Sequence, residues 1–282
     1  MTAPFSIRTM TPADLDRAIS WAGMEGWNPG LGDAGPFLAA DPGGFLMGYL
    51  DDEPITAISV VRYGDRFGFL GFYICRPAWR GKGYGWQTWQ AGMDHLGTRT
   101  VGLDGVVDQQ ENYRRSGFAF AYRNVRFGGH VTVERPDDPR LVTIEPALTE
   151  RIQAYDAAFF PAARRAFLDL WLAPSGGRRG LALVADGTIR GYGVIRPAVD
   201  GFKIGPLFAE TEQDADLLFR ALAAEACGAA LVIDPPEPNE GALRLVERYG
   251  LTPSFETARM YRGVAPSLPI ERIFGVTSFE LG

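Results

Sequence analysis

Cysteine and histidine are scarce in this chain, which has only two of each among its 282 residues. Cys75 and Cys227 lie far apart in apolar runs, so we expect two small buried hydrophobic side chains and no disulfide framework. His95 and His130 share no metal-type spacing with acidic residues, and no metal site is expected. Cys75 also lacks a neighbouring histidine that could activate it as an acyl-carrying nucleophile.

Long apolar runs and an excess of basic residues are also absent. No stretch of about eighteen apolar residues occurs, and no basic segment followed by an apolar one opens the chain, so we expect a soluble cytoplasmic protein. The net charge of −6 argues against general binding to nucleic acid or to a membrane surface. A bound phosphate would therefore depend on local cations, which Arg76, Arg80 and Lys82 supply.

Glycine, in contrast, is concentrated in one short segment. Residues 69–75 read as a buried strand, and Pro77 ends it because proline cannot donate to a sheet. Three glycines and two cations follow in Arg80-Gly81-Lys82-Gly83-Tyr84-Gly85, and apolar residues then recur at helical spacing. Such a helix start presents unpaired N–H groups and a positive dipole end. We interpret the segment as a pyrophosphate-binding loop; the alternative is a tight turn whose glycines only permit close packing.

The spacing of this loop separates it from two other phosphate-binding loops. The dinucleotide pattern needs a glycine in place of Trp86, and the Walker pattern needs a Lys-Ser or Lys-Thr pair. The segment from Ile74 to Gly85 instead resembles the R-G-x-G-x-G signature of the GNAT superfamily of acyl-CoA-dependent N-acetyltransferases. The resemblance implies acetyl-CoA as the acyl donor, with its pyrophosphate on the loop. The implied contacts come from Arg80, Gly81, Lys82, Gly83, Tyr84, Gly85 and Trp86.

An internal repeat divides the chain into two similar halves. A nearly constant shift of 133 or 134 residues relates Pro12 to Pro146, Asp52 to Asp186, Gly68 to Gly201 and Gly117 to Gly250. We interpret this as a duplication, with a polar linker over residues 134–140. We predict an N-terminal GNAT acetyltransferase domain over residues 1–133 and a degenerate GNAT-like domain over residues 141–282. The second domain lacks the glycine loop, and its acidic helix start would repel pyrophosphate.

The predicted fold class is α/β, a mixed α+β sheet, arranged as tandem GNAT folds. In the first half we expect strands at 5–10, 44–50, 55–63, 67–75, 101–107 and 118–127, and helices at 12–22, from 84, and at 111–116. In the second half we expect strands at 141–145, 180–185, 189–196, 201–209, 229–234 and 255–262, and helices at 148–172, 212–226 and 239–249. The tail to Gly282 is expected to pack on either domain.

Further short segments resemble bacterial two-domain GNAT proteins of the YitH/HolE type. They are E-G-W-N-P-G from Glu25, Q-Q-E-N-Y ending at Tyr113, A-Y-R-N ending at Asn124, I-G-P-L from Ile204, R-M-Y ending at Tyr261, and the closing F-E-L-G. The resemblance implies transfer of an acyl group from acyl-CoA to an amine. It does not identify the amine.

The resemblance also implies where the chemistry occurs. In the family motif N-x-x-A-x-x-L-Y-x-x-x-G-F, the second half has Val246 at the tyrosine position, whereas the first half keeps Tyr113. Tyr113 would protonate the departing thiolate; the alternative is an aromatic that only packs in the core. The backbone of Tyr73, Ile74 and Cys75 would hold the pantetheine arm and stabilise the oxyanion, a contribution of about 3 kcal/mol per donor.

An acid and several aromatics in the loop after the first helix are candidates for handling the amine. Glu25 is the candidate general base, with Asp33 behind it, because burial beside Trp27 would raise the pKa of a carboxyl. The alternative is that Glu25 is solvated or only binds loop N–H groups. Trp27, Asn28 and Phe37 are candidates for the acceptor pocket and are equally suited to the core.

We therefore predict an N-acetyltransferase that acts on the primary amine of a small molecule, with the second domain walling a pocket between the domains. Two alternatives stay open: a non-catalytic acyl-CoA sensor, and an enzyme that acetylates protein N-termini or lysines. The oligomeric state is left open between monomer and homodimer. We expect solvated faces at Arg164-Arg165 and Arg178-Arg179, and expect Asp234 only to end a strand.

Overall fold

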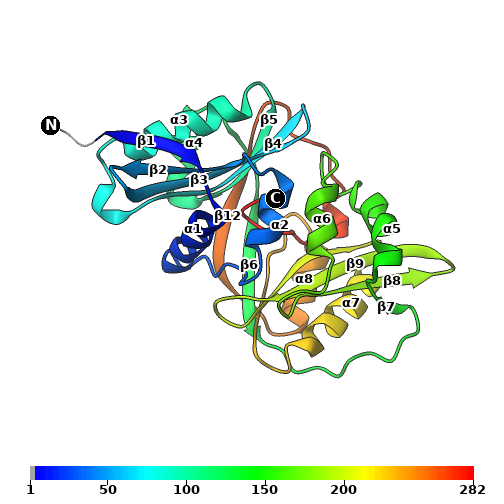
Figure 1. Cartoon of the computed structure of the whole chain (residues 1–282). Coiled ribbons are helices and arrows are strands. Elements are labelled where there is room, and N and C mark those ends of the chain that lie inside the picture. The colour runs from blue at the N-terminus through cyan, green and yellow to red at the C-terminus, as the bar shows by residue number, and fades with distance from the viewer. Residues whose placement is uncertain (1–3) are drawn as a thin grey trace.

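The computed structural model describes residues 4–282, which build one twisted sheet of thirteen strands with helices on its faces (Figure 1). The first half contains β1 Phe5–Thr9, α1 Pro12–Met24, α2 Ala34–Ala40, β2 Phe45–Leu50, β3 Glu53–Tyr63, β4 Phe67–Cys75, α3 Tyr84–Leu96, β5 Thr100–Val106, α4 Gln110–Arg115 and β6 Ala119–His130. The second contains β7 Leu141–Thr143, α5 Pro146–Asp156, α6 Arg165–Trp171, β8 Arg179–Ala185, β9 Thr188–Pro197, β10 Phe202–Ala209, α7 Glu212–Glu225, β11 Ala230–Ile233, α8 Glu240–Arg248, β12 Thr252–Arg262 and β13 Ile273–Gly275. Short 3-10 helices lie at η1 Pro77–Trp79, η2 Val107–Gln109 and η3 Ile270–Arg272. The predicted mixed sheet is confirmed, because β4 pairs in parallel with β5 while most other strands pair antiparallel.

Helix α1 begins where its sequence predicts. The Thr11 hydroxyl accepts a hydrogen bond from the Asp14 N–H (3.2 Å), and the Asp14 carboxylate accepts one from the Thr11 N–H (3.0 Å). This capping box satisfies two donors, and Pro12 occupies the first turn, where its missing N–H costs nothing. The helix runs two residues past the predicted end and places Glu25 at its C-cap.

The two halves exchange strands at the centre of the sheet. The strand order is β1-β2-β3-β4-β5-β12-β6-β11-β10-β9-β8-β7. Strand β12 of the second half lies between β5 and β6 of the first and pairs antiparallel with both, while β6 also pairs with β11. Figure 1 shows β6 and β12 side by side through the middle of the molecule. Each half therefore shares backbone hydrogen bonds with the other, and the domain boundaries at 133 and 141 stay a prediction.

The long helix predicted over 148–172 is wrong, because the chain forms α5 and α6 with a bend between them. Pro161 lies in the bend and cannot donate the hydrogen bond that a continuous helix requires. After the bend, the buried Arg164 folds back onto Asp156, with 2.8 Å between Nε and Oδ2. Helix α2, which the sequence analysis did not expect, packs against α6 from the first half.

Several polar side chains lie elsewhere than predicted. The expectation of solvated faces is confirmed for Arg165 and Arg179 but is wrong for Arg164 and Arg178, which are buried beside aspartates. Cys227 is exposed after α7, so the expectation of a buried side chain is wrong there.

Asp234 does more than end a strand. Its carboxylate is buried and accepts two hydrogen bonds from Arg126, at 2.7 and 2.8 Å. Arg126 lies on β6 and Asp234 directly follows β11, so the pair joins the first half to the second.

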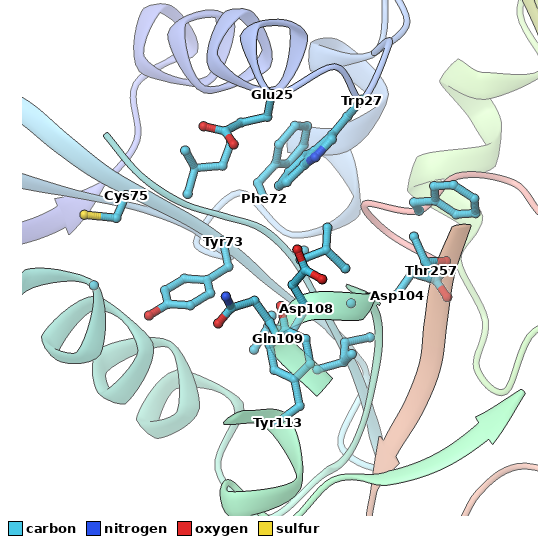
Figure 2. A pocket seen from close by; sticks show the side chains of 18 of the residues that line it. Glu25, Trp27, Phe72, Tyr73, Cys75, Asp104, Asp108, Gln109, Tyr113 and Thr257 are labelled. Atoms are coloured by element: carbon cyan, nitrogen blue, oxygen red, sulfur yellow. The ribbon is translucent and has the colours of Figure 1, made fainter. Parts of the chain in front are cut away.

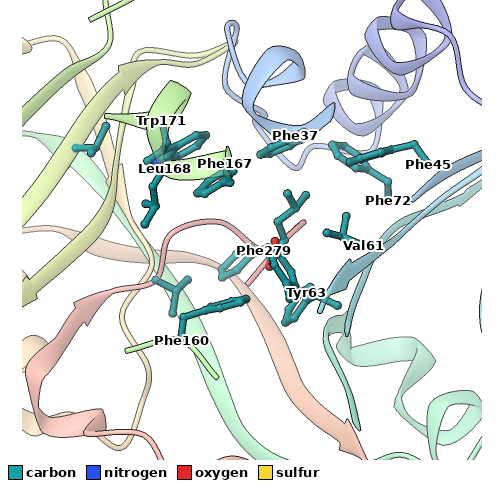
Figure 3. Close-up of a cluster of buried hydrophobic side chains, with 14 of the residues drawn as sticks. Phe37, Phe45, Val61, Tyr63, Phe72, Phe160, Phe167, Leu168, Trp171 and Phe279 are labelled. Carbon is teal, nitrogen blue, oxygen red and sulfur yellow. The ribbon is translucent and has the colours of Figure 1, made fainter. Parts of the chain in front are cut away.

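A single apolar cluster fills the space between the halves. Figure 3 shows Phe37 and Phe72 of the first half facing Phe167 and Trp171 of α6. The rings of Phe37 and Trp171 stack with 6.1 Å between their centroids. Phe279 of the C-terminal tail belongs to the same cluster, so the tail packs between the halves. Because both halves contribute to one core, they hold each other in fixed positions.

Candidate active site

The predicted glycine loop leads directly into α3. Gly81 and Gly83 have φ values of 73° and 84°, a left-handed conformation that other residues rarely adopt, and Gly83 is the N-cap. Within residues 4–282, the N–H groups of residues 81–86 have no backbone acceptor. These donors lie at the N-terminal end of α3, which is also the positive end of its dipole. The loop therefore presents a binding site for an anion such as a pyrophosphate.

The two strands that lead to the loop part from each other. Strand β4 pairs with β5 only as far as Leu70 and Leu103. Beyond this pair Phe72 has a φ of 45° and the register of β4 against β3 shifts, while β5 remains paired with β12 along its other edge. The edge of β4 from Gly71 to Cys75 is thereby left without a strand partner on the β5 side, the arrangement that the family resemblance implies for a pantetheine arm.

A cavity of about 1060 Å³ opens between the parted strands and extends from the glycine loop to the second half (Figure 2). From the first half it is lined by Glu25, Trp27, Leu70, Gly71, Phe72, Tyr73, Ile74, Cys75, Arg80, Gly81, Gly83, Gly85, Trp86, Leu103, Asp104, Gly105, Val106, Val107, Asp108, Gln109 and Tyr113. From the second half it is lined by Phe255, Glu256, Thr257, Phe279 and Glu280. Most of the residues predicted for cofactor binding and catalysis thus border one space.

Two predicted loop contacts point elsewhere, because Lys82 and Tyr84 are not among the lining residues. The Lys82 ammonium lies over the Trp79 ring, 4.7 Å from its centroid. The Tyr84 ring packs on Phe5, with 4.9 Å between the ring centroids. Both side chains contribute to the outer surface of the loop, while their backbone N–H groups remain available to an anion.

Of the three side chains predicted for the acceptor pocket, only Trp27 lines the cavity. The Asn28 amide exchanges two hydrogen bonds with the backbone of Asp200, at 2.8 and 3.0 Å, and so fixes the loop to the second half. Phe37 is buried in the core. Asp33, placed behind Glu25 by the sequence analysis, is buried between Arg178 and Arg196 and does not line the cavity.

Glu25 lies at the outer rim of the cavity and is paired with Arg80 of the glycine loop. Arg80 also donates a hydrogen bond from Nε to the carbonyl of Cys75 (2.8 Å). The Glu25 side chain is 30% exposed, so the deep burial on which its predicted role depends is not present. This carboxylate orients the loop cation in the arrangement seen here.

Tyr113 of α4 is buried at the cavity wall. Its ring stacks on Trp89, with 5.7 Å between the centroids. Gly105 makes room for it, because a Cβ there would lie 2.2 Å from Cε2 of the tyrosine ring. Burial raises the pKa of the Tyr113 phenol above its ordinary value of about 10, so the hydroxyl keeps its proton at neutral pH. A protonated phenol facing the cavity can donate that proton to a thiolate.

The Cys75 side chain is not suited to nucleophilic catalysis. Burial raises the pKa of its thiol, which disfavours the reactive thiolate. Cys75 is the last residue of β4, next to the glycine loop. The predicted contact with the acyl donor involves its backbone and not its thiol.

The inner end of the cavity contains residues that the sequence analysis did not single out. Figure 2 shows Thr257 and Asp104 at the end of the lining opposite Cys75. Thr257 belongs to β12 and Glu280 to the C-terminal tail, and both are buried. Thr257 reaches the cavity through the strand exchange, and Glu280 reaches it because the tail packs on Gly71, so neither is marked by residues close in sequence. The closing F-E-L-G segment, which contains Glu280, was the one sequence signal available.

Residues 4–282 contain no group of three or more histidine, cysteine or acidic side chains placed to hold a metal ion. In the same residues, no helix is both long enough and apolar enough to cross a membrane.

Comparisons with known proteins agree with this geometry. Residues 13–118 match the acetyltransferase (GNAT) family, and residues 152–275 match an acetyltransferase (GNAT) domain. The chain is 35% identical to the holothin acyltransferase of Pseudoalteromonas sp. (strain SANK 73390), over 97% of this chain and 94% of the relative.

Solved structures share the whole fold. A putative acetyltransferase from Pyrococcus horikoshii superposes with a TM-score of 0.80 at 23% identity, covering 99% of this chain and 96% of that one. A tandem GNAT protein from the clavulanic acid biosynthesis pathway has a TM-score of 0.60 at 13% identity, covering 94% and 100%. Fold and site together define an acyl-CoA-dependent acyltransferase. The chain belongs to the GNAT superfamily and has the tandem form of its fold.

Proposed function

We propose that the protein transfers an acetyl group from acetyl-CoA to the primary amine of a small molecule. One observation carries the proposal: a single cavity joins the unpaired N–H groups of the glycine loop to the buried Tyr113 phenol. The similarity to a relative named as an acyltransferase supports acyl transfer.

The cavity provides a group for each stage of the reaction. The amine nitrogen attacks the thioester carbonyl, and an unpaired N–H on the edge of β4 stabilises the charge on the carbonyl oxygen. The carbon–sulfur bond then breaks, and Tyr113 gives its proton to the departing sulfur. Because a thiol of this kind has a pKa near ~8.5, a proton donor accelerates its departure by about 100-fold or more.

The walls that both halves contribute to the cavity favour a small acceptor over a protein chain. Phe255, Thr257 and Phe279 form part of the wall on the side of the second half. An extended peptide would need an open groove across the surface, whereas a compact amine fits within the walls.

Release of free thiol from acetyl-CoA tests the proposal. Purified protein is mixed with acetyl-CoA and one of tryptamine, spermidine, glucosamine or a lysine-containing peptide. We expect at least one small amine to accelerate thiol release more than the peptide does. Faster release with the peptide would instead support a protein acetyltransferase, and acetyl-CoA binding without amine-dependent release would support a sensor.

A further inference from the structure

Two buried oxygen atoms on the cavity wall lack hydrogen-bond partners. Among the described residues, Oε2 of Glu280 and Oγ1 of Thr257 have none. The two residues are only 5% and 2% exposed, and both line the cavity. Buried polar atoms are nearly always paired, and an unpaired buried carboxylate is unfavourable unless a ligand completes it. These two oxygens therefore point to a bound group that donates hydrogen bonds.

The other four carboxylates on the cavity wall are different. Asp104 is satisfied by Arg259, whose Nε and Nη2 donate to its two oxygens at 2.8 and 2.7 Å. Glu25 and Glu256 are paired with arginines. Asp108 lies exposed at the rim. Among the described carboxylates of the cavity wall, Glu280 is the buried one that has an oxygen without a hydrogen-bond partner.

Two buried cations influence this carboxylate without bonding to it. Arg126 donates to Asp234 and to the carbonyl of Trp27. Lys203 donates from Nζ to the carbonyl of Asn28 (3.1 Å). They offset part of its negative charge, and Oε2 of the carboxylate has no hydrogen-bond partner among the described residues.

Residues of the first half hold the backbone of the tail at Glu280 in place. A Cβ on Gly71 would lie 2.3 Å from the Glu280 carbonyl oxygen, so the glycine permits the close approach of the tail. That carbonyl accepts a hydrogen bond from Ser59 (3.3 Å), and the next one, of Leu281, accepts from Tyr63 (3.1 Å). Gly71 follows the last residue at which β4 pairs with β5, so the tail carboxylate is fixed where the cavity opens.

We propose that Glu280 and Thr257 bind the amino group of the acceptor, so that the second half completes the active site of the first. The apolar walls beside them, Trp27, Phe255 and Phe279, fit an amine carried on a flat aromatic skeleton. This inference rests on the proposed function and specifies its substrate class.

The proposed step balances its protons. The ammonium form of the acceptor gives one proton to the Glu280 carboxylate, which later releases it to solvent. The neutral amine then forms the carbon–nitrogen bond as the carbon–sulfur bond breaks. The second proton lost by nitrogen replaces the one that Tyr113 gives to the thiolate. The products are an amide, free CoA and one released proton.

The test compares Glu280→Gln with Glu271→Gln, the same substitution at an exposed tail residue that does not line the cavity. Tryptamine is the acceptor. For Glu280→Gln we expect kcat/KM for tryptamine to fall about 100-fold or more, with the Kd for acetyl-CoA unchanged. Calorimetric titration of tryptamine into CoA-saturated protein should show a similar loss of affinity. Glu271→Gln should behave as the wild type in both measurements.

Thr257→Val gives a second, independent reading, because it removes one hydroxyl and keeps the shape of the side chain. We expect it to raise KM for tryptamine about tenfold with little change in kcat. An unchanged acetyl-CoA Kd shows that each variant is folded.

Wild-type kcat/KM and tryptamine affinity in Glu280→Gln would overturn the amine site. A wild-type protein that acylates spermidine but neither binds nor acylates tryptamine would overturn the aromatic acceptor, whereas no thiol release with any amine would refute the proposed function itself.

Discussion

Tyr113 shows how packing fixes a single phenol at the cavity wall, as its proposed role in proton transfer requires. Its ring is confined by Trp89 and by the space that Gly105 leaves, and no hydrogen bond within residues 4–282 engages its hydroxyl. The raised pKa follows from burial first, and the nearby Tyr73 adds to it. The phenol is thus held at the cavity wall in its protonated form, which is the form that a departing thiolate requires.

Replacing Tyr113 by phenylalanine removes only this hydroxyl. We expect kcat to fall about 100-fold, because the thiolate then departs without a proton donor, while the Kd for acetyl-CoA stays the same. Steady-state kinetics and calorimetry measure the two quantities. Tyr249→Phe is the control, because that tyrosine lies on the second half outside the cavity. Wild-type turnover in Tyr113→Phe would remove the residue from catalysis.

At the scale of elements, strand β4 has one edge without a strand partner beyond Leu70, and this is the edge that we propose for the acyl donor. Gly71, where this stretch begins, receives the C-terminal tail. The tail therefore depends on the absence of one Cβ. The atoms nearest to a Cβ on Gly71 would be backbone atoms of Glu280, which move less easily than the end of a flexible side chain. A methyl group at this position must therefore displace the tail.

We expect Gly71→Ala to lower the free energy of unfolding by about 1–3 kcal/mol, because its Cβ would lie 2.3 Å from the Glu280 carbonyl oxygen. The variant should also lose activity toward the amine acceptor while it still binds acetyl-CoA. Urea unfolding and calorimetry provide the measurements. Gly35→Ala is the matched control, because a Cβ there would meet nothing within 4 Å. Equal stability of both variants would show that the tail tolerates the methyl group.

The glycine loop and α3 could be predicted from sequence because their signal is local. Six consecutive residues encode the turn, the charge and the helix start. The roles of Asn28 and Phe37 were harder to predict, because they depend on residues far away in sequence. Asn28 bonds to Asp200, which is 172 residues away, and Phe37 packs on α6. The α5–α6 bend was missed because the apolar spacing continues through it and only Pro161 marks the break.

At the scale of the whole molecule, the strand exchange makes the two halves one structure. The pattern of β12 fits any antiparallel strand, so the sequence indicates a strand and does not show that it pairs with β5 of the other half. The contribution of Thr257 to the cavity could not be predicted for the same reason, and that of Glu280 depends on contacts of the tail with Gly71 and Ser59, more than 200 residues away in sequence. The loss of the glycine loop in the second half is consistent with a new role for that half as a wall of the cavity.

Lys203 links the halves by donating to Asn28, and burial lowers its pKa from 10.5 to about 8. Between these values the unfolded chain binds more protons than the folded one, so this lysine makes stability rise with pH. Relative to Lys203→Met, the wild type should gain up to about 1 kcal/mol per pH unit between pH 8 and 9.5. Denaturant unfolding at several pH values tests this. A constant difference between the two proteins would contradict the lowered pKa.

The account depends most on the binding of a pyrophosphate at the start of α3, and calorimetric titration with acetyl-CoA tests this directly. Gly83→Glu places a negative charge and bulk on the loop, and Gly64→Glu makes the same change at another left-handed glycine with open space around it, outside the cavity. We predict that Gly83→Glu abolishes acetyl-CoA binding and that Gly64→Glu retains the wild-type Kd. Wild-type affinity in Gly83→Glu would contradict the loop as the site of the acyl donor.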